Sequence, residues 1–134
     1  MSDPMTKDIK SQPEKLNMIL TNYFENSKYK KRLKEVIHYI ENNDNPIFFA
    51  GMGSSNYAAI SAINIFSKKG YFCINPDIDE FIHYQMNFID KSFTIIAISQ
   101  SGKSAETKKI LENLSDNNTV IAVTNYEDSP IAKM

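Results

Sequence analysis

The sequence predicts an α/β fold in which helices cover both faces of a parallel β-sheet. From about residue 46 onward, short apolar runs alternate with helical stretches, which is the pattern of a layered α/β domain. The runs are apolar at consecutive positions, as strands are when both faces of their sheet are covered. Three of the four glycines, Gly51, Gly53 and Gly102, follow the first and third runs, where the backbone must turn sharply or approach a ligand.

Residues 1–45 are predicted to form an N-terminal helical arm. Pro13 is expected to end a first segment and to occupy the first turn of a new helix, because proline lacks the N–H that a helix interior uses. An amphipathic helix follows, with apolar residues at intervals of three and four positions. These residues are Tyr29, Leu33, Val36, Ile37 and Ile40.

Residues 46–134 are predicted to form the α/β domain itself. We expect strands at 47–50, 71–74, 93–98 and 119–123, and helices at 55–69, 79–86 and 104–114. Together they would make a three-layer αβα, flavodoxin-like sheet of order 2-1-3-4. The chain stops at SPIAKM, before the fifth strand of such a sheet, so we expect the domain to be incomplete at its C-terminus.

Composition argues against several function classes. The chain has 15 basic and 16 acidic side chains with no long block of like charge, so no nucleic-acid partner is expected. No apolar stretch approaches the ~18 residues of a membrane span, and the start MSDPMTKDIK is not a signal peptide. The single cysteine, Cys73, cannot form an internal disulfide, so we expect a cytoplasmic protein.

Two polar, glycine-containing loops form the candidate site: AGMGSSN (residues 50–56, the first loop) and SQSGKS (residues 99–104, the second loop). The first and third strands are neighbours in a 2-1-3-4 sheet, and the loops at their carboxyl ends diverge to open a crevice. Each loop also opens a helix, whose free N–H groups and positive dipole end favour an anion, above all phosphate. Neither loop has the glycine spacing of a dinucleotide or P-loop motif, which argues against ATP or GTP.

Helix capping is the alternative explanation for the serines of these loops. It accounts well for Ser104, which Glu106 and Thr107 follow, but it explains only one or two of the six polar side chains. These six are Ser54, Ser55, Ser99, Gln100, Ser101 and Ser104. A binding role for the group explains the pattern better.

Two further polar residues are weak candidates for a catalytic base: Glu80 and His83. The acidic run Asp77, Asp79 and Glu80 is explained more simply as a helix start, with negative charge at the positive end of the dipole. No metal-ligand spacing and no cofactor motif occurs in the sequence, so we expect neither a metal nor a cofactor.

The GMGSS loop and the pattern S-Q-S-G-x-[ST]-x-[DE]-T resemble the SIS (sugar isomerase) domain, which binds phosphosugars; the likeness covers about residues 34–134. The head, MTKDIKSQPEKLNMIL, is similar to the start of the isomerase half of glucosamine–fructose-6-phosphate synthases, "M-x-K-E-I-x-E-Q-P". This points to the branch of glucosamine synthases and fructosamine deglycases. It points away from sugar-binding transcription regulators, in which the SIS domain follows a helix-turn-helix that this sequence does not show.

The resemblance implies roles for residues at matching positions. Ser54 and Ser55 would touch the sugar phosphate or its chain, and the second loop would hold the phosphate. Lys103 replaces the glutamate or asparagine common at its position, and Asp79 replaces the serine of an "S-E-F" motif. The whole implied phosphosugar-binding set is Gly53, Ser54, Ser55, Ser99, Gln100, Ser101, Gly102, Ser104 and Thr107.

Synthases of this branch carry two SIS domains, and their isomerising glutamate, histidine and lysine come from the second domain and the C-terminal tail. The resemblance therefore implies a first SIS domain that binds a hexose 6-phosphate in an amino-sugar or ketose–aldose phosphate isomerase or deglycase system. We expect the isolated chain to be inactive, because no candidate base has a convincing place in it. We also expect it to pair with a second copy or a second SIS domain, because the helix at 58–66 is apolar nearly all round. The alternative is a non-catalytic sugar-phosphate sensor.

Overall fold

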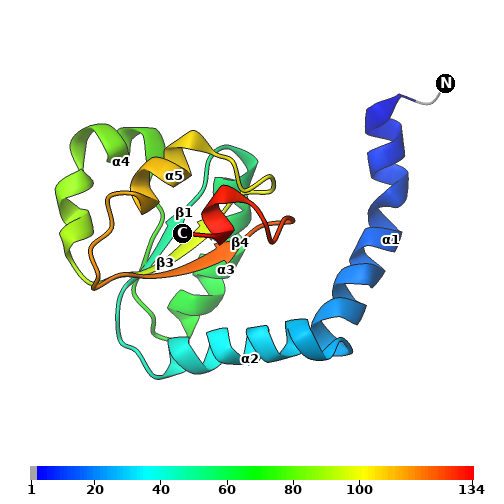
Figure 1. Ribbon diagram of the computed structural model, residues 1–134, viewed down its shortest axis with the longest axis horizontal. Coiled ribbons are helices and arrows are strands. Elements are labelled where there is room, and N and C mark those ends of the chain that lie inside the picture. The colour runs from blue at the N-terminus through cyan, green and yellow to red at the C-terminus, as the bar shows by residue number, and fades with distance from the viewer. Residues whose placement is uncertain (1–2) are drawn as a thin grey trace. The chain divides into compact units, whose positions relative to one another are not determined.

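The computed structural model describes residues 3–134, except for the side chain of Asp90. The chain divides into two compact units, Met1–Asn43 and Asp44–Met134. The first unit contains two helices and the second contains the sheet (Figure 1).

The first unit consists of α1 (Pro4–Phe24) and α2 (Ser27–Glu41). The predicted break at Pro13 is wrong, because α1 runs through this residue without interruption. Proline removes one helical hydrogen bond but keeps a helical φ, and good helix formers such as Glu14 and Lys15 continue the helix beyond it. Asn26 begins α2 by accepting a hydrogen bond from the Lys28 N–H at 2.9 Å.

The second unit is a parallel four-stranded sheet of order β2-β1-β3-β4, as predicted. Its strands are β1 (Ile47–Ala50), β2 (Cys73–Ile74), β3 (Thr94–Ile98) and β4 (Thr119–Val123). Its helices are α3 (Ser54–Lys68), α4 (Ile78–Tyr84), η1 (Met86–Asp90), α5 (Ala105–Leu111) and η2 (Pro130–Ala132).

The strand β2 is shorter than predicted, because residues before it serve to end α3. The Tyr71 N–H donates to the carbonyl of Phe66 at 3.1 Å, and Gly70 has a φ of +93°, the left-handed geometry of a helix C-terminus. Only the Phe72 carbonyl, which accepts from the Ile47 N–H at 2.9 Å, and the two residues after it are left for the sheet.

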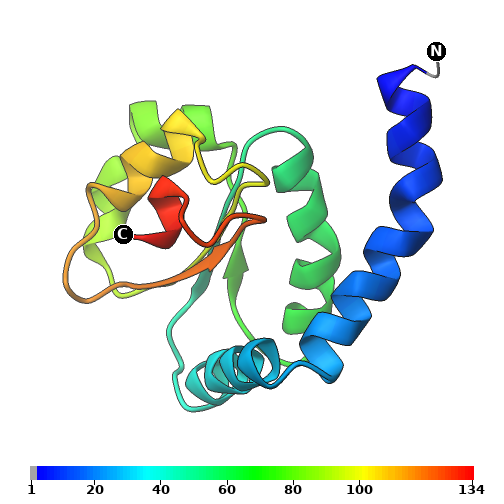
Figure 2. The same ribbon diagram turned by 45° about the vertical axis from the view of Figure 1, so that its right-hand side comes forward.

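Helices cover both faces of the sheet, which explains why its strands are apolar at consecutive positions. In Figure 2, α4, α5 and η2 lie on one side of the strands and α3 on the other. Phe48 points to the first side, where its ring centroid lies 4.8 Å from that of Phe81 and 5.9 Å from that of Phe93. Phe49 points to the other side and lies 6.2 Å from Phe66 of α3.

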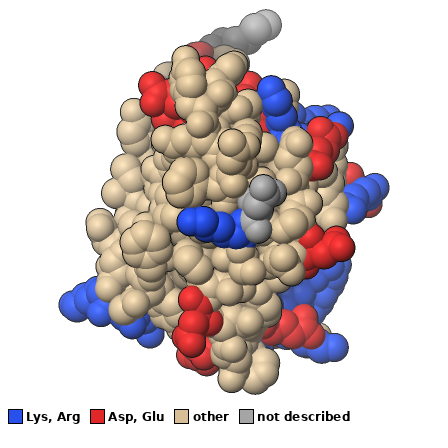
Figure 3. All heavy atoms as spheres, turned by 90° about the vertical axis from the view of Figure 1, so that its left-hand side faces the viewer, with Lys and Arg blue, Asp and Glu red and all other residues tan. Residues whose placement is uncertain are grey.

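Much of the apolar surface of α3 is exposed in the single chain. Ala59 is its one buried residue among those described, whereas Tyr57, Ile60 and Ile65 are exposed by 73%, 47% and 61%. The expected cover from another subunit or a further domain remains a prediction. On the face of the molecule seen from the side of α4, acidic and basic side chains are interspersed over a mostly uncharged surface (Figure 3).

Replacing Phe48 with alanine is expected to lower the free energy of unfolding by about 3–5 kcal/mol, because it removes a ring that is 1% exposed from between two other rings. The matched control is Phe72→Ala, where the ring is 69% exposed and the expected change is within about 0.5 kcal/mol. Urea titration followed by circular dichroism measures both. Equal losses for the two variants would contradict the assignment of the core.

Candidate functional site

The first and second loops leave neighbouring strands at the same edge of the sheet. Ala50, the last residue of β1, pairs with Ala97 of β3, and adjacent strands lie about 4.8 Å apart. In Figure 2 the loop after β3 and the loop after β4 lie side by side at this edge, next to the start of α3. The expected switch point is therefore present, and the segment after β4 also reaches it.

The first loop is tightly turned at both glycines. A Cβ at Gly51 would lie 3.0 Å from the backbone carbon of Ser55, and Gly53 has a φ of +53° that favours glycine. Gly53 occupies the N-cap position of α3, and no side chain caps this helix. The side chains of Ser54 and Ser55 therefore do not cap α3.

The second loop combines capping with an exposed hydroxyl. The Ser104 hydroxyl accepts from the Thr107 N–H at 3.2 Å and donates to Glu106 Oε2 at 3.1 Å, so the capping interpretation is confirmed for this residue. Ser101 is exposed, and its Oγ accepts from the Lys103 N–H at 3.3 Å. Ser99 is buried, and its N–H donates to the Val123 carbonyl at 3.0 Å.

Residues 124–131, which we call the clamp segment, form hydrogen bonds with the backbone of the second loop. The Gln100 carbonyl accepts from the Asn125 N–H at 3.2 Å and from the Thr124 hydroxyl at 3.4 Å. The Gly102 carbonyl accepts from the Ile131 N–H at 3.3 Å. These hydrogen bonds direct both carbonyl oxygens toward the clamp segment.

The clamp segment also explains the glycine of the second loop. Gly102 has a φ of +63°, and a Cβ there would collide with the Oγ and Cβ atoms of Ser129 and lie 2.9 Å from Thr124 Oγ1. Sequence analysis missed these residues, because nothing in the sequence links them to a loop more than 20 positions earlier. The dipeptide Ser129-Pro130, at which η2 begins, is the one local sequence feature that could have indicated this segment.

An open cavity of about 330 Å³ lies between the second loop and the clamp segment. It is lined by Ser101, Lys103, Tyr126, Asp128, Ser129 and Pro130. Lys103 brings a cation to its wall, whereas the Asp128 carboxylate lies 3.4 Å from Lys133 Nζ in an exposed ion pair. Ser101 therefore lines open space beside Lys103.

Four buried side-chain oxygens have no hydrogen-bond partner among the described residues, and each follows a different strand of the sheet. They are Asn56 Oδ1 after β1, Asn75 Oδ1 after β2, Thr107 Oγ1 after β3 and Ser129 Oγ after β4. Buried polar atoms are normally bonded, and each one left unpaired costs about 1–3 kcal/mol.

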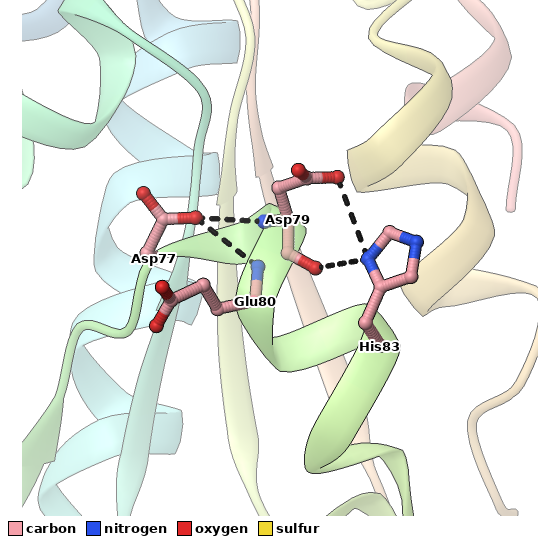
Figure 4. A network of polar contacts seen from close by, with 4 residues as sticks. All are labelled: Asp77, Asp79, Glu80 and His83. Carbon is pink, nitrogen blue, oxygen red and sulfur yellow. Dashed lines mark hydrogen bonds and ion pairs between the residues drawn. The ribbon is translucent and has the colours of Figure 1, made fainter.

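The two weak candidates for a base do not converge. Asp77 caps α4, its Oδ1 accepting from the Asp79 and Glu80 N–H groups at 3.0 and 3.2 Å. His83 Nδ1 lies 2.7 Å from the Asp79 carbonyl and 3.6 Å from its carboxylate. Figure 4 shows the Glu80 carboxylate on the opposite side of the helix start from the His83 ring. The side chains of Glu80 and His83 therefore belong to a short helix whose start is capped in the ordinary way by Asp77.

Other reactive groups lie outside this site. Burial raises the pKa of the Cys73 thiol above its usual range, and a side-chain hydrogen bond with Ser67 opposes the shift only in part. Within residues 3–134, no group of three or more His, Cys, Asp or Glu side chains is placed to hold a metal ion. No helix in that range has the length and apolar character needed to cross a membrane.

A parallel sheet with helices on both faces and polar, glycine-containing loops at its carboxyl edge defines a three-layer α/β domain. The family model described as SIS domain matches residues 39–134, so the chain belongs to the SIS domain family. The resemblance inferred from the two loops is confirmed.

Curated relatives include enzymes and a regulator. The chain is 32% identical over 107 residues to a glutamine–fructose-6-phosphate aminotransferase (isomerizing) of Methanocaldococcus jannaschii, covering 80% of this chain and 9% of that protein. It is 28% identical over 131 residues to the enzyme of the same name from Bartonella quintana, covering 96% and 21%. An uncharacterized HTH-type transcriptional regulator of Haemophilus influenzae is 30% identical over 104 residues, covering 77% and 36%.

Solved structures share the fold. The tagatose-6-phosphate ketose/aldose isomerase of Escherichia coli matches with a TM-score of 0.77 and 19% identity, over 95% of this chain and 36% of that one. A protein of Escherichia coli CFT073, solved as a ligand complex, matches with a TM-score of 0.74 and 20% identity, over 99% and 71%. At these identities the likeness shows the fold alone. The chain spans about a tenth and a fifth of the two curated aminotransferases.

Replacing Gly102 with alanine is expected to destabilise the protein by more than the roughly 1–2 kcal/mol that a left-handed alanine costs, because the new methyl group also collides with Ser129. Gly70→Ala is the control, since Gly70 has a φ of +93° but open space around its missing Cβ. Urea unfolding compares the two variants. If Gly102→Ala lowered the free energy of unfolding no more than Gly70→Ala does, the clamp segment would not constrain the second loop.

Proposed function

We propose that this SIS domain binds a hexose 6-phosphate, with the phosphate on the second loop and the sugar chain toward the first. One observation carries the proposal: the clamp segment bonds the carbonyl oxygens of Gln100 and Gly102 from behind. These carbonyl oxygens of the second loop are thereby held toward the clamp segment. The loop also lies at the positive end of the α5 dipole, and both features favour a dianion.

The surrounding side chains suit a phosphate carried on a polyhydroxy skeleton. Ser101 offers an exposed hydroxyl beside the cavity, and Lys103 supplies a cation there. Hydroxyls donate and accept, so Ser54 and Ser55 fit sugar hydroxyls as well as phosphate oxygens. Thr107, near the start of α5, and Ser129, beside Gly102, are buried with unpartnered hydroxyls.

Within this proposal the domain serves an amino-sugar or ketose–aldose phosphate isomerase or deglycase system. The two aminotransferase relatives support that context, and we propose that a second SIS domain or a second copy of the chain completes the reacting site. We also propose a cytoplasmic location, where such sugar phosphates occur. The alternative is a non-catalytic sugar-phosphate sensor. The likeness to the Haemophilus regulator over 77% of the chain supports this second candidate.

Fructose 6-phosphate and glucosamine 6-phosphate are expected to bind and to stabilise the fold, by about 2.7 kcal/mol at a hundredfold excess over Kd. Ser101→Ala should weaken this binding about ten- to a hundredfold, since a hydrogen bond to a charged group contributes roughly 1.5–3 kcal/mol. Titration calorimetry measures the affinities.

Two controls sharpen this measurement. Ser61→Ala removes an exposed hydroxyl from the middle of α3, away from both loops, and should leave the affinity unchanged. Unphosphorylated fructose should bind far more weakly than its phosphate. Equal affinity for both sugars would refute the assignment of the phosphate to the second loop.

The chain by itself is expected to show no isomerase turnover, because Glu80 and His83 are exposed and do not converge. Exchange of the C2 proton of bound glucosamine 6-phosphate with deuterated water, followed by NMR, tests this. Rapid exchange that Glu80→Gln or His83→Gln abolishes would show that one of them is a base after all.

A further inference from the structure

Lys103 brings a positive charge to the open cavity beside the second loop. Among the six residues that line this cavity, it is the one with a cationic side chain. Its ammonium group forms no ion pair or hydrogen bond with the side chains that the structure describes. Lys108 and Lys133, by contrast, lie 3.2 Å and 3.4 Å from the carboxylates of Glu112 and Asp128. The charge of Lys103 is therefore available to a ligand.

The backbone on both sides of Lys103 is fixed, so its side chain leaves the loop at a defined point. The carbonyl of the preceding residue, Gly102, accepts from the Ile131 N–H at 3.3 Å. The Lys103 N–H donates to Ser101 Oγ at 3.3 Å, and the next residue, Ser104, is the N-cap of α5. The flexible stem of lysine then carries a compact charge into the cavity that Ser101 also lines.

The one acidic side chain on the cavity wall does not cancel this charge. Asp128 Oδ1 lies 3.4 Å from Lys133 Nζ, and no ion pair joins Asp128 to Lys103 among the described contacts. Glu106, which follows the second loop, accepts a hydrogen bond from the Ser104 hydroxyl at 3.1 Å. The cavity wall therefore keeps the positive charge that Lys103 supplies.

We propose that Lys103 determines the charge specificity of the second loop, which selects a phosphate monoester over esters that carry a single negative charge. A phosphate monoester carries close to two negative charges above pH 7, because its second pKa is about 6. Sulfate esters and phosphodiesters carry only one. Since the Coulomb energy is proportional to the charge of the ligand, a cation attracts the monoester about twice as strongly.

This inference rests on the proposed binding of a hexose 6-phosphate and adds a residue that decides which ester is bound. Backbone N–H groups and the Ser101 hydroxyl donate to phosphate and sulfate oxygens alike, because both groups are tetrahedral. Lys103 distinguishes the two groups by their charge. The resemblance to the SIS family implies no cation here, since glutamate or asparagine is common at this position.

Titration calorimetry at pH 8 with glucosamine 6-phosphate and glucosamine 6-sulfate tests the inference, because these ligands differ only in the ester group. Lys103→Met should weaken binding of the phosphate about tenfold and binding of the sulfate about threefold, the square root of that factor. Lys103→Arg keeps the charge and should keep both affinities within about twofold of the wild type. Lys109→Met is the matched control and should change neither affinity, since Lys109 is exposed on α5 and does not line the cavity.

The salt dependence of binding gives a second readout, which a purely structural role of Lys103 would not change. The affinity for glucosamine 6-phosphate should fall less steeply with salt in Lys103→Met than in the wild type, because salt screens charge. Equal losses for the phosphate and the sulfate, or no loss, would overturn the role of Lys103 and leave the proposed binding intact. A wild type that does not bind the phosphate would contradict both proposals.

Discussion

The contact between Gly102 and Ser129 is the constraint on which the rest of the site depends. No side chain other than hydrogen fits at position 102, and the left-handed φ of this residue turns the backbone just before α5 begins. The turn lets the Gly102 carbonyl accept from Ile131, whose side chain is 1% exposed in the core. The candidate anion loop is thereby tied to the hydrophobic core. A loop that must present N–H groups to a dianion gains from such support, since little ordering remains to be done on binding.

The topology of the sheet supplies the rest of the arrangement. Every strand is parallel, so every loop that leaves a strand's carboxyl end lies on one edge. That edge is followed by segments holding four buried, unpartnered side-chain oxygens, whereas the interior of the sheet is apolar and closely packed. Unpaired buried oxygens lower stability.

The sequence was sufficient to predict the strands, their order and the two loops, because each rests on a local signal. Consecutive apolar residues marked covered strands, and scarce glycines marked the turns. Other features depend on contacts that no local pattern reveals. Pro13 sits within a continuous helix, β2 loses residues to the end of α3, and the clamp segment acts across more than 20 positions. The sequence did single out Ser104 as a helix cap, from Glu106 and Thr107 that follow it, but it held no sign that a glycine and no side chain begins α3.

The most direct test of the account is to titrate the protein with fructose 6-phosphate while recording backbone amide shifts by NMR. The account predicts that the amide protons of Ser101, Gly102 and Ser104 move most, with smaller shifts at Ser54 and Ser55. Inorganic phosphate should move the first three in the same direction and leave the two serines of the first loop nearly unchanged. Shifts confined to other parts of the chain, or no saturable shift at the second loop, would contradict it.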